Sequence, residues 1–315
     1  MRRVQRGVAL LVVLWACTLL AILVGGFAGI ARVEALQTRY TLGQQRARYA
    51  AEAAIMRAIV VAQARRQQIM RVQMGDASPR DGSLPGDGRS LAFVFDRVHV
   101  AVAMLDESGK VDINSAEPRA LKALFVAAGC RVDRADQLTR RILEWRGPTM
   151  GAAAVDGVSP VVASAGNPSA RYTAFAAIEE LQGLPGMDDE LYSRLEPAIT
   201  IWSGQPAPQP DFASVLAMAA VRGIDLPSAR EIVRARDSVP PGTPLTNLPG
   251  GIALGGALPG NTMTFRANAD DGHGGRATVE ATVRFPFSGA DRVPGEALYT
   301  VLRWRDGPAS SGGAP

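Results

Sequence analysis

An uncharged apolar run near the N-terminus constrains this chain more than any other feature. Residues 8–30 read VALLVVLWACTLLAILVGGFAGI, which is 23 residues without a charged side chain. A helix rises about 1.5 Å per residue, so the run would reach roughly 35 Å and cross the ~30 Å hydrocarbon core of a bilayer. A backbone in lipid must satisfy its own hydrogen bonds, so we expect a helix. Arg2, Arg3 and Arg6 precede the run, which places the N-terminus in the cytoplasm.

The helical pattern continues beyond the apolar run. No proline occurs between residues 8 and 79, so one helix of about 65 residues is predicted, with its second half amphipathic. A secretory signal peptide would instead have a shorter apolar region and a break after it. An ordinary membrane anchor would have a linker at the membrane exit. The apolar positions after the run are Val33, Leu36, Tyr40, Ala47, Ala51, Ile55, Ala58 and Ala62.

The net charge at first suggests a nucleic-acid partner, but the basic residues are unevenly placed. The chain has 34 Lys and Arg against 30 Asp and Glu, and its pI is near 9.4. Without residues 1–7, 31 basic residues face 30 acidic ones. No block of Lys or Arg remains that would bind phosphates, so we expect no nucleic-acid partner. The two cysteines, Cys17 and Cys130, cannot form a disulfide framework or a cysteine zinc site.

After the long helix, the sequence predicts a β region that a helical domain interrupts. Alternating apolar residues predict one or two strands in 91–105, and three more in 262–269, 276–285 and 298–304. Between them, three helical hairpins of similar length predict a compact α domain, with Ser115 capping its first helix. The predicted segments are a basic leader (1–7), a transmembrane part (8–30) and an amphipathic part (31–73) of one helix, a first β region (74–112), an α domain (113–238), a Pro/Gly-rich connector (239–261), closing strands (262–305) and a disordered tail (306–315).

The N-terminal pattern resembles that of type IV prepilins and the pseudopilins of type II secretion. A short leader ends in Arg6-Gly7, and the long apolar helix follows at once from Val8. In that family a prepilin peptidase cuts after the glycine on the cytoplasmic side, and the new first residue is usually N-methylated. The resemblance therefore implies cleavage between Gly7 and Val8. Glycine suits such a site because it adds no Cβ.

The fifth residue after the implied cut narrows the resemblance. Most pilins have a Glu there, which is thought to pair with the amino group of the neighbouring subunit, but this chain has Val12. A carboxylate in hydrocarbon is costly without a partner, and a subunit with no neighbour ahead of it gains nothing from one. Absence of that Glu is typical of the general secretion pathway protein K family, the minor pseudopilins at the filament tip.

Five further segments resemble the same family. GKVDINSAEPRALKALF and FAAIEELQGLPGMDDELYSRLEPAITIWSG are similar to its inserted domain, and TFRANA, ATVEATVRF and LYTVLRW to its closing sheet. The resemblance implies an α+β fold, in which a pilin-like long N-terminal helix packs on an antiparallel sheet. A large all-α, SAM-like domain of helical hairpins is inserted in that sheet.

The resemblance also implies a function, which is assembly and initiation of the type II pseudopilus and protein secretion across the outer membrane, without enzymatic activity. The chain would span the bacterial inner membrane once, with its bulk in the periplasm. The implied partners are minor pseudopilins I and J, with H as a further candidate, the prepilin peptidase, and as additional candidates the outer-membrane secretin and secreted cargo.

Acidic turns and helical hairpins leave other chemistries open. Asp188-Asp189 and Asp270-Asp271 are candidate Ca²⁺ ligands, although solvated turn charges are the plainer interpretation and no cofactor is expected to be required. A turn at residues 184–186 is similar to that of helix-hairpin-helix modules, so the alternative function is a membrane-anchored periplasmic DNA-binding or uptake protein. The acids at 188–190 would repel a phosphate there. A membrane-anchored hydrolase is the third hypothesis, but no G-x-S-x-G motif occurs.

Overall fold

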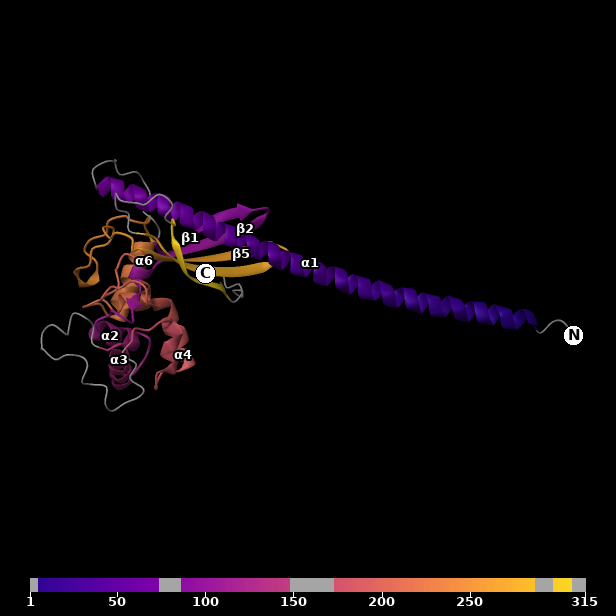
Figure 1. Ribbon diagram of the computed structural model, residues 1–315, viewed down its shortest axis with the longest axis horizontal. Coiled ribbons are helices and arrows are strands. Elements are labelled where there is room, and N and C mark those ends of the chain that lie inside the picture. Colours follow the sequence, from indigo (N-terminus) through magenta and orange to yellow (C-terminus); the bar gives the residue numbers. More distant parts are fainter. Residues whose placement is uncertain (1–4, 74–85, 148–172, 287–296, 308–315) are drawn as a thin grey trace.

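The computed structural model describes residues 5–73, 86–147, 173–286 and 297–307. Its most prominent element is α1 (Gln5–Gln73), a single helix of 69 residues, which confirms the predicted long helix. The N-terminal part of α1 projects far from the rest of the molecule, and the other end lies on a sheet (Figure 1). The first four residues of the predicted leader lie outside the described part.

The sheet has five antiparallel strands in the order β1-β2-β5-β6-β7. They are β1 (Asp87–Phe95), β2 (Val98–Asp106), β5 (Thr262–Asp270), β6 (Arg276–Arg284) and β7 (Thr300–Gly307). The prediction that residues 306 and 307 belong to a disordered tail is wrong, because both pair with β6 opposite Val279 and Thr278. The rest of that tail, 308–315, lies outside the described residues.

One face of α1 packs on the sheet over the length of β2, β5 and β6. Most of its contact residues are alanines, so the helix can lie close to the strands, and the larger Ile55 and Ile59 are almost fully buried. The buried sheet-facing positions of the helix are Ala47, Ala50, Ala51, Ala54, Ile55, Ala58, Ile59 and Ala62. Five of these eight residues are among the apolar positions that the helical spacing of the sequence predicts, namely Ala47, Ala51, Ile55, Ala58 and Ala62.

The helix leaves the sheet at Gly43, where the β5–β6 hairpin touches its backbone. A Cβ added to Gly275 would lie 2.5 Å from the carbonyl group of Gly43, and a Cβ on Gly43 would lie 2.8 Å from Asp271 Oδ2. This close approach therefore requires two glycines. From Leu10 to Leu42, every residue of α1 is exposed.

The helical domain lies between β2 and β5 in the sequence, as predicted, and has its own apolar core. Its α-helices are α2 (Pro118–Ala127), α3 (Val132–Arg146), α4 (Asp189–Leu195), α5 (Val215–Met218) and α6 (Leu226–Asp237). Its short 3₁₀ helices are η1 (Glu107–Gly109), η3 (Ile178–Gly183) and η4 (Glu196–Ala198), with η5 (Pro249–Gly251) in the connector. Two two-residue strands, β3 (Val111–Asp112) and β4 (Ile199–Thr200), pair in parallel.

The predicted capping of α2 by Ser115 is wrong. The residue at the cap position is Glu117, whose side chain makes no capping hydrogen bond. Ser115 lies instead in a turn held by Asp112, whose carboxylate accepts backbone N–H bonds from Asn114 at 2.9 Å and Ser115 at 3.2 Å. The buried aspartate organises this turn because it also accepts from the Gly204 amide at 2.7 Å, which ties the turn to the chain after β4.

Candidate functional site

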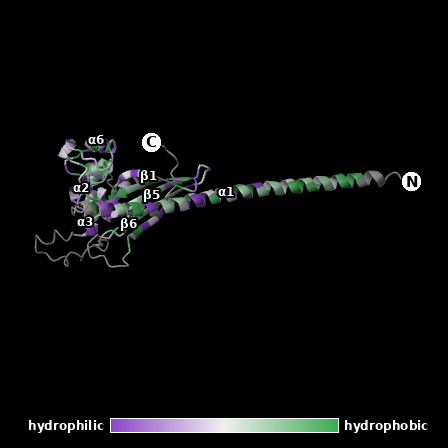
Figure 2. Cartoon of the chain, turned by 90° about the horizontal axis from the view of Figure 1, so that it is seen from above, coloured by the Kyte–Doolittle hydropathy of each residue, from purple (hydrophilic) through white to green (hydrophobic). Residues whose placement is uncertain are grey.

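The exposed half of α1 is the first functional surface. Within the described residues, α1 is the one helix long and apolar enough to cross a membrane, and its mean hydropathy reaches 2.6. Figure 2 shows the apolar colour concentrated in its N-terminal half. Gly7 and Val8 lie in the first turns of this helix, and Val12 is 59% exposed on its surface. These features fit a single-pass membrane anchor whose folded remainder lies outside the lipid.

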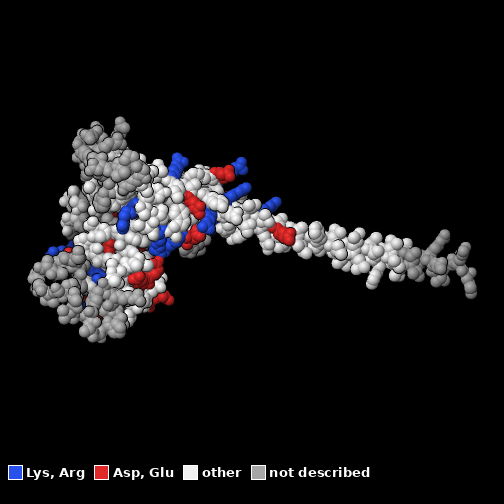
Figure 3. Space-filling view, in the orientation of Figure 1, with Lys and Arg blue, Asp and Glu red and all other residues white. Residues whose placement is uncertain are grey.

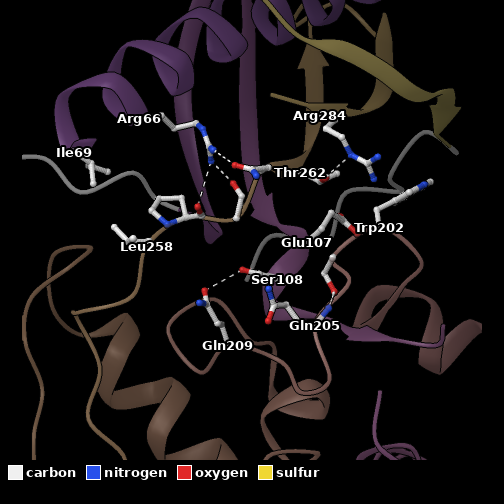
Figure 4. A pocket seen from close by; sticks show the side chains of 14 residues that line it. Arg66, Ile69, Glu107, Ser108, Trp202, Gln205, Gln209, Leu258, Thr262 and Arg284 are labelled. Atoms are coloured by element: carbon white, nitrogen blue, oxygen red, sulfur yellow. Dashed lines mark hydrogen bonds between the residues drawn. The ribbon is translucent and has the colours of Figure 1, made fainter. Parts of the chain in front are cut away.

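The second surface is a cavity of about 490 Å³ where α1, the sheet and the helical domain meet. Figure 4 shows Arg66 of α1 and Arg284 of β6 on one side, with Gln205 and Gln209 of the helical domain on the other. The Ser108 hydroxyl bridges the two sides, because it donates to Asp106 at 2.6 Å and lies 3.1 Å from the Gln209 amide oxygen. All three parts of the protein are therefore joined around this cavity.

Asp106 is the centre of the junction. Its carboxylate accepts hydrogen bonds from the Ser108 amide at 2.9 Å and the Gly260 amide at 2.7 Å, in addition to the Ser108 hydroxyl. Burial raises the pKa of Asp106 above its ordinary value, although these bonds and the charge of Arg66 oppose that shift. Arg66 in turn donates to the Gly260 carbonyl and, at 2.5 Å, to Asn261 Oδ1. Burial lowers the pKa of Arg66.

Glu107 follows directly and is completely buried. Its Oε1 accepts hydrogen bonds from Lys110 Nζ and Thr264 Oγ1, both at 2.6 Å, and so links η1 to β5. Its Oε2 has no hydrogen-bond partner among the described residues. In the sequence, Asp106 and Glu107 precede Ser108-Gly109, a pattern that is typical of an exposed turn. The structure shows instead that they hold the helical domain to the sheet.

A second set of ion pairs fastens the helical domain to β7. Glu280 of β6 accepts from Arg266 Nε and Arg305 Nε, both at 2.8 Å, and Arg305 also donates to Glu196 of η4 at 2.6 Å. Arg303 pairs with Glu179 of η3. Burial alone would raise the pKa of Glu280, but the charges of Arg266 and Arg305 outweigh it and lower that pKa. The Glu280 and Arg305 pairs link three strands and η4 in one network, and the Arg303–Glu179 pair adds a separate link from β7 to η3.

We expect Glu280→Gln to destabilise the full chain in detergent at pH 7 by about 1–2 kcal/mol, since both arginines are partly exposed and screened. The lowered pKa means that the stability contributed by Glu280 is present above its ordinary value of 4.5 and is lost as the pH falls below it. Urea unfolding between pH 7 and pH 3 checks this. The wild type should lose more stability than the variant, and parallel curves would contradict the assignment.

The candidate calcium ligands lie in two separate places, and three of the four carboxylates, those of Asp188, Asp270 and Asp271, already accept hydrogen bonds. Asp270 accepts from the Gly272 amide at 2.8 Å and Arg276 Nε at 2.9 Å, and Asp271 accepts from two amides of the same turn. Asp188 caps α4, and Asp189 occupies its first turn. Within the described parts of the chain, no group of three or more His, Cys, Asp or Glu side chains is arranged to hold a metal ion.

The turn before α4, which resembles a DNA-binding hairpin, is occupied by groups of this chain. Asp188 accepts from the Leu191 amide at 2.8 Å, so the helix start has its own carboxylate. Arg134 of α3 donates to the Gly186 carbonyl at 2.8 Å and to Asp188 at 2.5 Å. The Leu191 bond, followed by the Arg134 contact, lowers the pKa of Asp188. A phosphate would have to displace an anion that the turn already holds.

A long helix on an antiparallel sheet, with a helical domain between two neighbouring strands, defines the class: a pilin-like protein with an inserted domain. Residues 100–204 match the family described as "Type II secretion system (T2SS), protein K". This matched region runs from β2 to just past β4, about a third of the chain, and the matched family is the one that the sequence resembles.

The fold has a solved counterpart. A chain in "The Crystal Structure of the GspK-GspI-GspJ complex from enterotoxigenic Escherichia coli Type 2 Secretion System" superposes with a TM-score of 0.51 at 16% identity. The likeness covers 86% of this chain and 99% of that chain. It concerns the fold, and it confirms the predicted α+β architecture. No curated protein matches the chain in sequence.

Proposed function

We propose that this chain is the minor pseudopilin at the tip of a type II secretion pseudopilus, where it initiates assembly and serves protein secretion across the outer membrane. The observation that carries the proposal is the position of the helical domain. It lies at the end of the molecule opposite to the N-terminal part of α1 (Figure 1), where it would obstruct the addition of another pilin-like subunit above it. Such a domain ends a filament.

The membrane helix supports the same role. We propose that α1 holds the chain in the inner membrane with its N-terminus in the cytoplasm, and that prepilin peptidase cuts between Gly7 and Val8. Val12 then lies where most pilins carry a glutamate. A tip subunit has no neighbour ahead of it, so a carboxylate in the hydrocarbon would have no amino group to meet. The function is mechanical, without catalytic turnover and without a required cofactor.

The proposed partners are the minor pseudopilins I and J, with H as a further one, together with the secretin or the cargo at the tip. The solved structure with the same fold is a complex of GspK with GspI and GspJ. Helix α1 offers the means of association, because its exposed length carries apolar side chains on both sides of Gly43. We propose that the Asp188-Asp189 and Asp270-Asp271 pairs mainly stabilise their turns. Ca²⁺ is a further candidate ligand for these pairs, and titration calorimetry of the metal-free chain with Ca²⁺ would detect its binding.

Co-purification tests the proposal. The full chain, expressed with the I and J pseudopilins of the same secretion system and extracted in mild detergent, should retain both through size exclusion. A folded chain that retains neither would overturn the tip assignment. Retention on DNA that falls with added salt would favour the alternative of a DNA-uptake protein. Labelling by a serine-reactive probe would favour a hydrolase.

A further inference from the structure

The surface of α1 that faces away from the sheet has a strict seven-residue repeat. Two series of positions alternate with spacings of three and four residues, as the a and d positions of a coiled coil do. The first series is Arg32, Arg39, Arg46, Ala53 and Val60, and the second is Ala35, Leu42, Tyr49 and Met56. We call these nine residues the outer stripe, and we call Arg32, Arg39 and Arg46 the stripe arginines.

Every residue of the outer stripe is exposed, although its upper half lies beside a well-packed core. Tyr49 is 67% exposed and Val60 61%, while Ala54 and Ile55 between them are fully buried against the sheet. At one border, the Tyr299 hydroxyl lies 3.3 Å from the sulfur of Met56. The upper part of the stripe, from Tyr49 to Val60, is thus an apolar helix face on the opposite side from the sheet, and no described part of the chain covers it.

The stripe arginines make no hydrogen bond or ion pair with any described residue. Arginines elsewhere on the same helix do have partners, since Arg48 pairs with Glu52 and Asp306, and Arg66 is held at the junction. Figure 3 shows basic side chains along the part of α1 next to the folded body, whereas residues 10–31 of the helix include no Lys or Arg. Three free cations at seven-residue spacing therefore continue an apolar seam toward the membrane.

We propose that the outer stripe binds one parallel α-helix of another pilin-like subunit, and that this helix carries Asp or Glu at the heptad positions facing the stripe arginines. This inference rests on the proposed function, which places both helices in one membrane with the same orientation. Seven residues rise about 10.5 Å, so the partner's carboxylates must recur at that interval. A sustained seven-residue repeat also winds the pair into a left-handed supercoil, which keeps the two seams in contact.

The same arginines exclude a second copy of this chain as the occupant. In a parallel pair of identical helices, equivalent a positions face each other, so each of the three arginines would meet an arginine. Like charges in contact cost several kcal/mol at an interface, whereas the apolar upper half alone would favour such a pair. The stripe thus selects a different, acidic subunit, and a single copy of this chain enters each assembly.

The first test reverses the charges in the complex with I and J. The stripe variant carries Arg32→Glu, Arg39→Glu and Arg46→Glu, and a control carries the same change at three exposed arginines of the helical domain, Arg140, Arg222 and Arg230. Recovery of the partner subunits should fall more than about tenfold for the stripe variant and stay unchanged for the control. Equal recovery from both variants, at unchanged melting temperatures, would overturn the proposal.

The second test needs no partner and so separates the stripe from the tip assignment. Sedimentation of the full chain in detergent should show a monomer. Replacing the stripe arginines with leucine completes the apolar seam and should produce a dimer. A wild-type dimer, or a leucine variant that remains monomeric, would overturn the inference. The two proposals can therefore fail separately. If the wild type retains neither I nor J but the leucine variant dimerises, the tip assignment is wrong, while the proposal that the stripe arginines prevent self-association is supported.

Discussion

Replacing Asp106 with alanine is expected to destabilise the protein by about 3 kcal/mol, more than any other single change at the junction. Three donors would lose their acceptor at once, namely the amide and hydroxyl of Ser108 and the amide of Gly260. Arg66, which is 6% exposed, would also lose the compensating charge of Asp106. Urea unfolding of the full chain in detergent, followed by tryptophan fluorescence, measures the loss.

The matched control for this experiment is Asp133→Ala. The Asp133 side chain is 85% exposed and lies 3.8 Å from Arg131 at the start of α3, so its loss should change stability by less than about 0.5 kcal/mol. Limited proteolysis adds a local readout, since the Asp106 variant should be cut near residues 258–261 before the sheet unfolds. Equal stability of the two variants would show that Asp106 does not organise the junction.

Gly7→Val is expected to leave the chain uncleaved and to abolish its entry into the pseudopilus. The backbone at Gly7 is helical, so the peptidase must unwind the first turn of α1 before the bond can lie extended in its active site. Glycine lowers the cost of that unwinding by about 1 kcal/mol relative to alanine, and it places no Cβ against the enzyme. A branched side chain removes the steric advantage.

Intact mass measurement of the membrane fraction reads out this prediction directly. The wild type should begin at Val8, and the variant should keep Met1. Gly29→Val is the control, because Gly29 lies in the same apolar helix and has no neighbouring atom within 4 Å of an added Cβ. If the Gly7 variant were processed at the normal rate, the cleavage site would have to lie elsewhere in the chain.

Repetition in the sequence explains which parts of the fold could be predicted. The long helix and the strands repeat one period over many residues, so the positions of Ala51, Ala58 and Val279 in the core follow from spacing alone. Within the predicted α domain, residues 178–183 form only the short 3₁₀ helix η3, because Pro185 has no N–H and Gly186 has a positive φ, so the chain turns there.

The junction could not be predicted, since its parts come from distant positions. Asp106 and Glu107 precede a Ser-Gly pair, which is the local signature of an exposed turn. Both are buried because Gly260 and Thr264 approach from more than 150 residues further along the chain. The parallel pair β3 and β4 has the same origin, since a two-residue strand such as Val111-Asp112 has no period of its own. The one sequence feature that hints at the junction is Gly109. A Cβ at this position would lie 2.4 Å from the Phe212 carbonyl oxygen, so the close packing here requires a glycine.

The insertion of the helical domain between two adjacent strands also affects the order in which the chain can fold. Glu107 and Thr264 are in contact although they lie 157 positions apart in the sequence, so β2 keeps an open edge until β5 pairs with it. Closing so long a loop is slow for a disordered chain. The helical domain has a separate core and can fold first, which brings its two ends together. Pairing of β5 with β2 then completes the sheet that covers the alanine face of α1. We therefore expect a chain in which this face is covered to have folded its helical domain already.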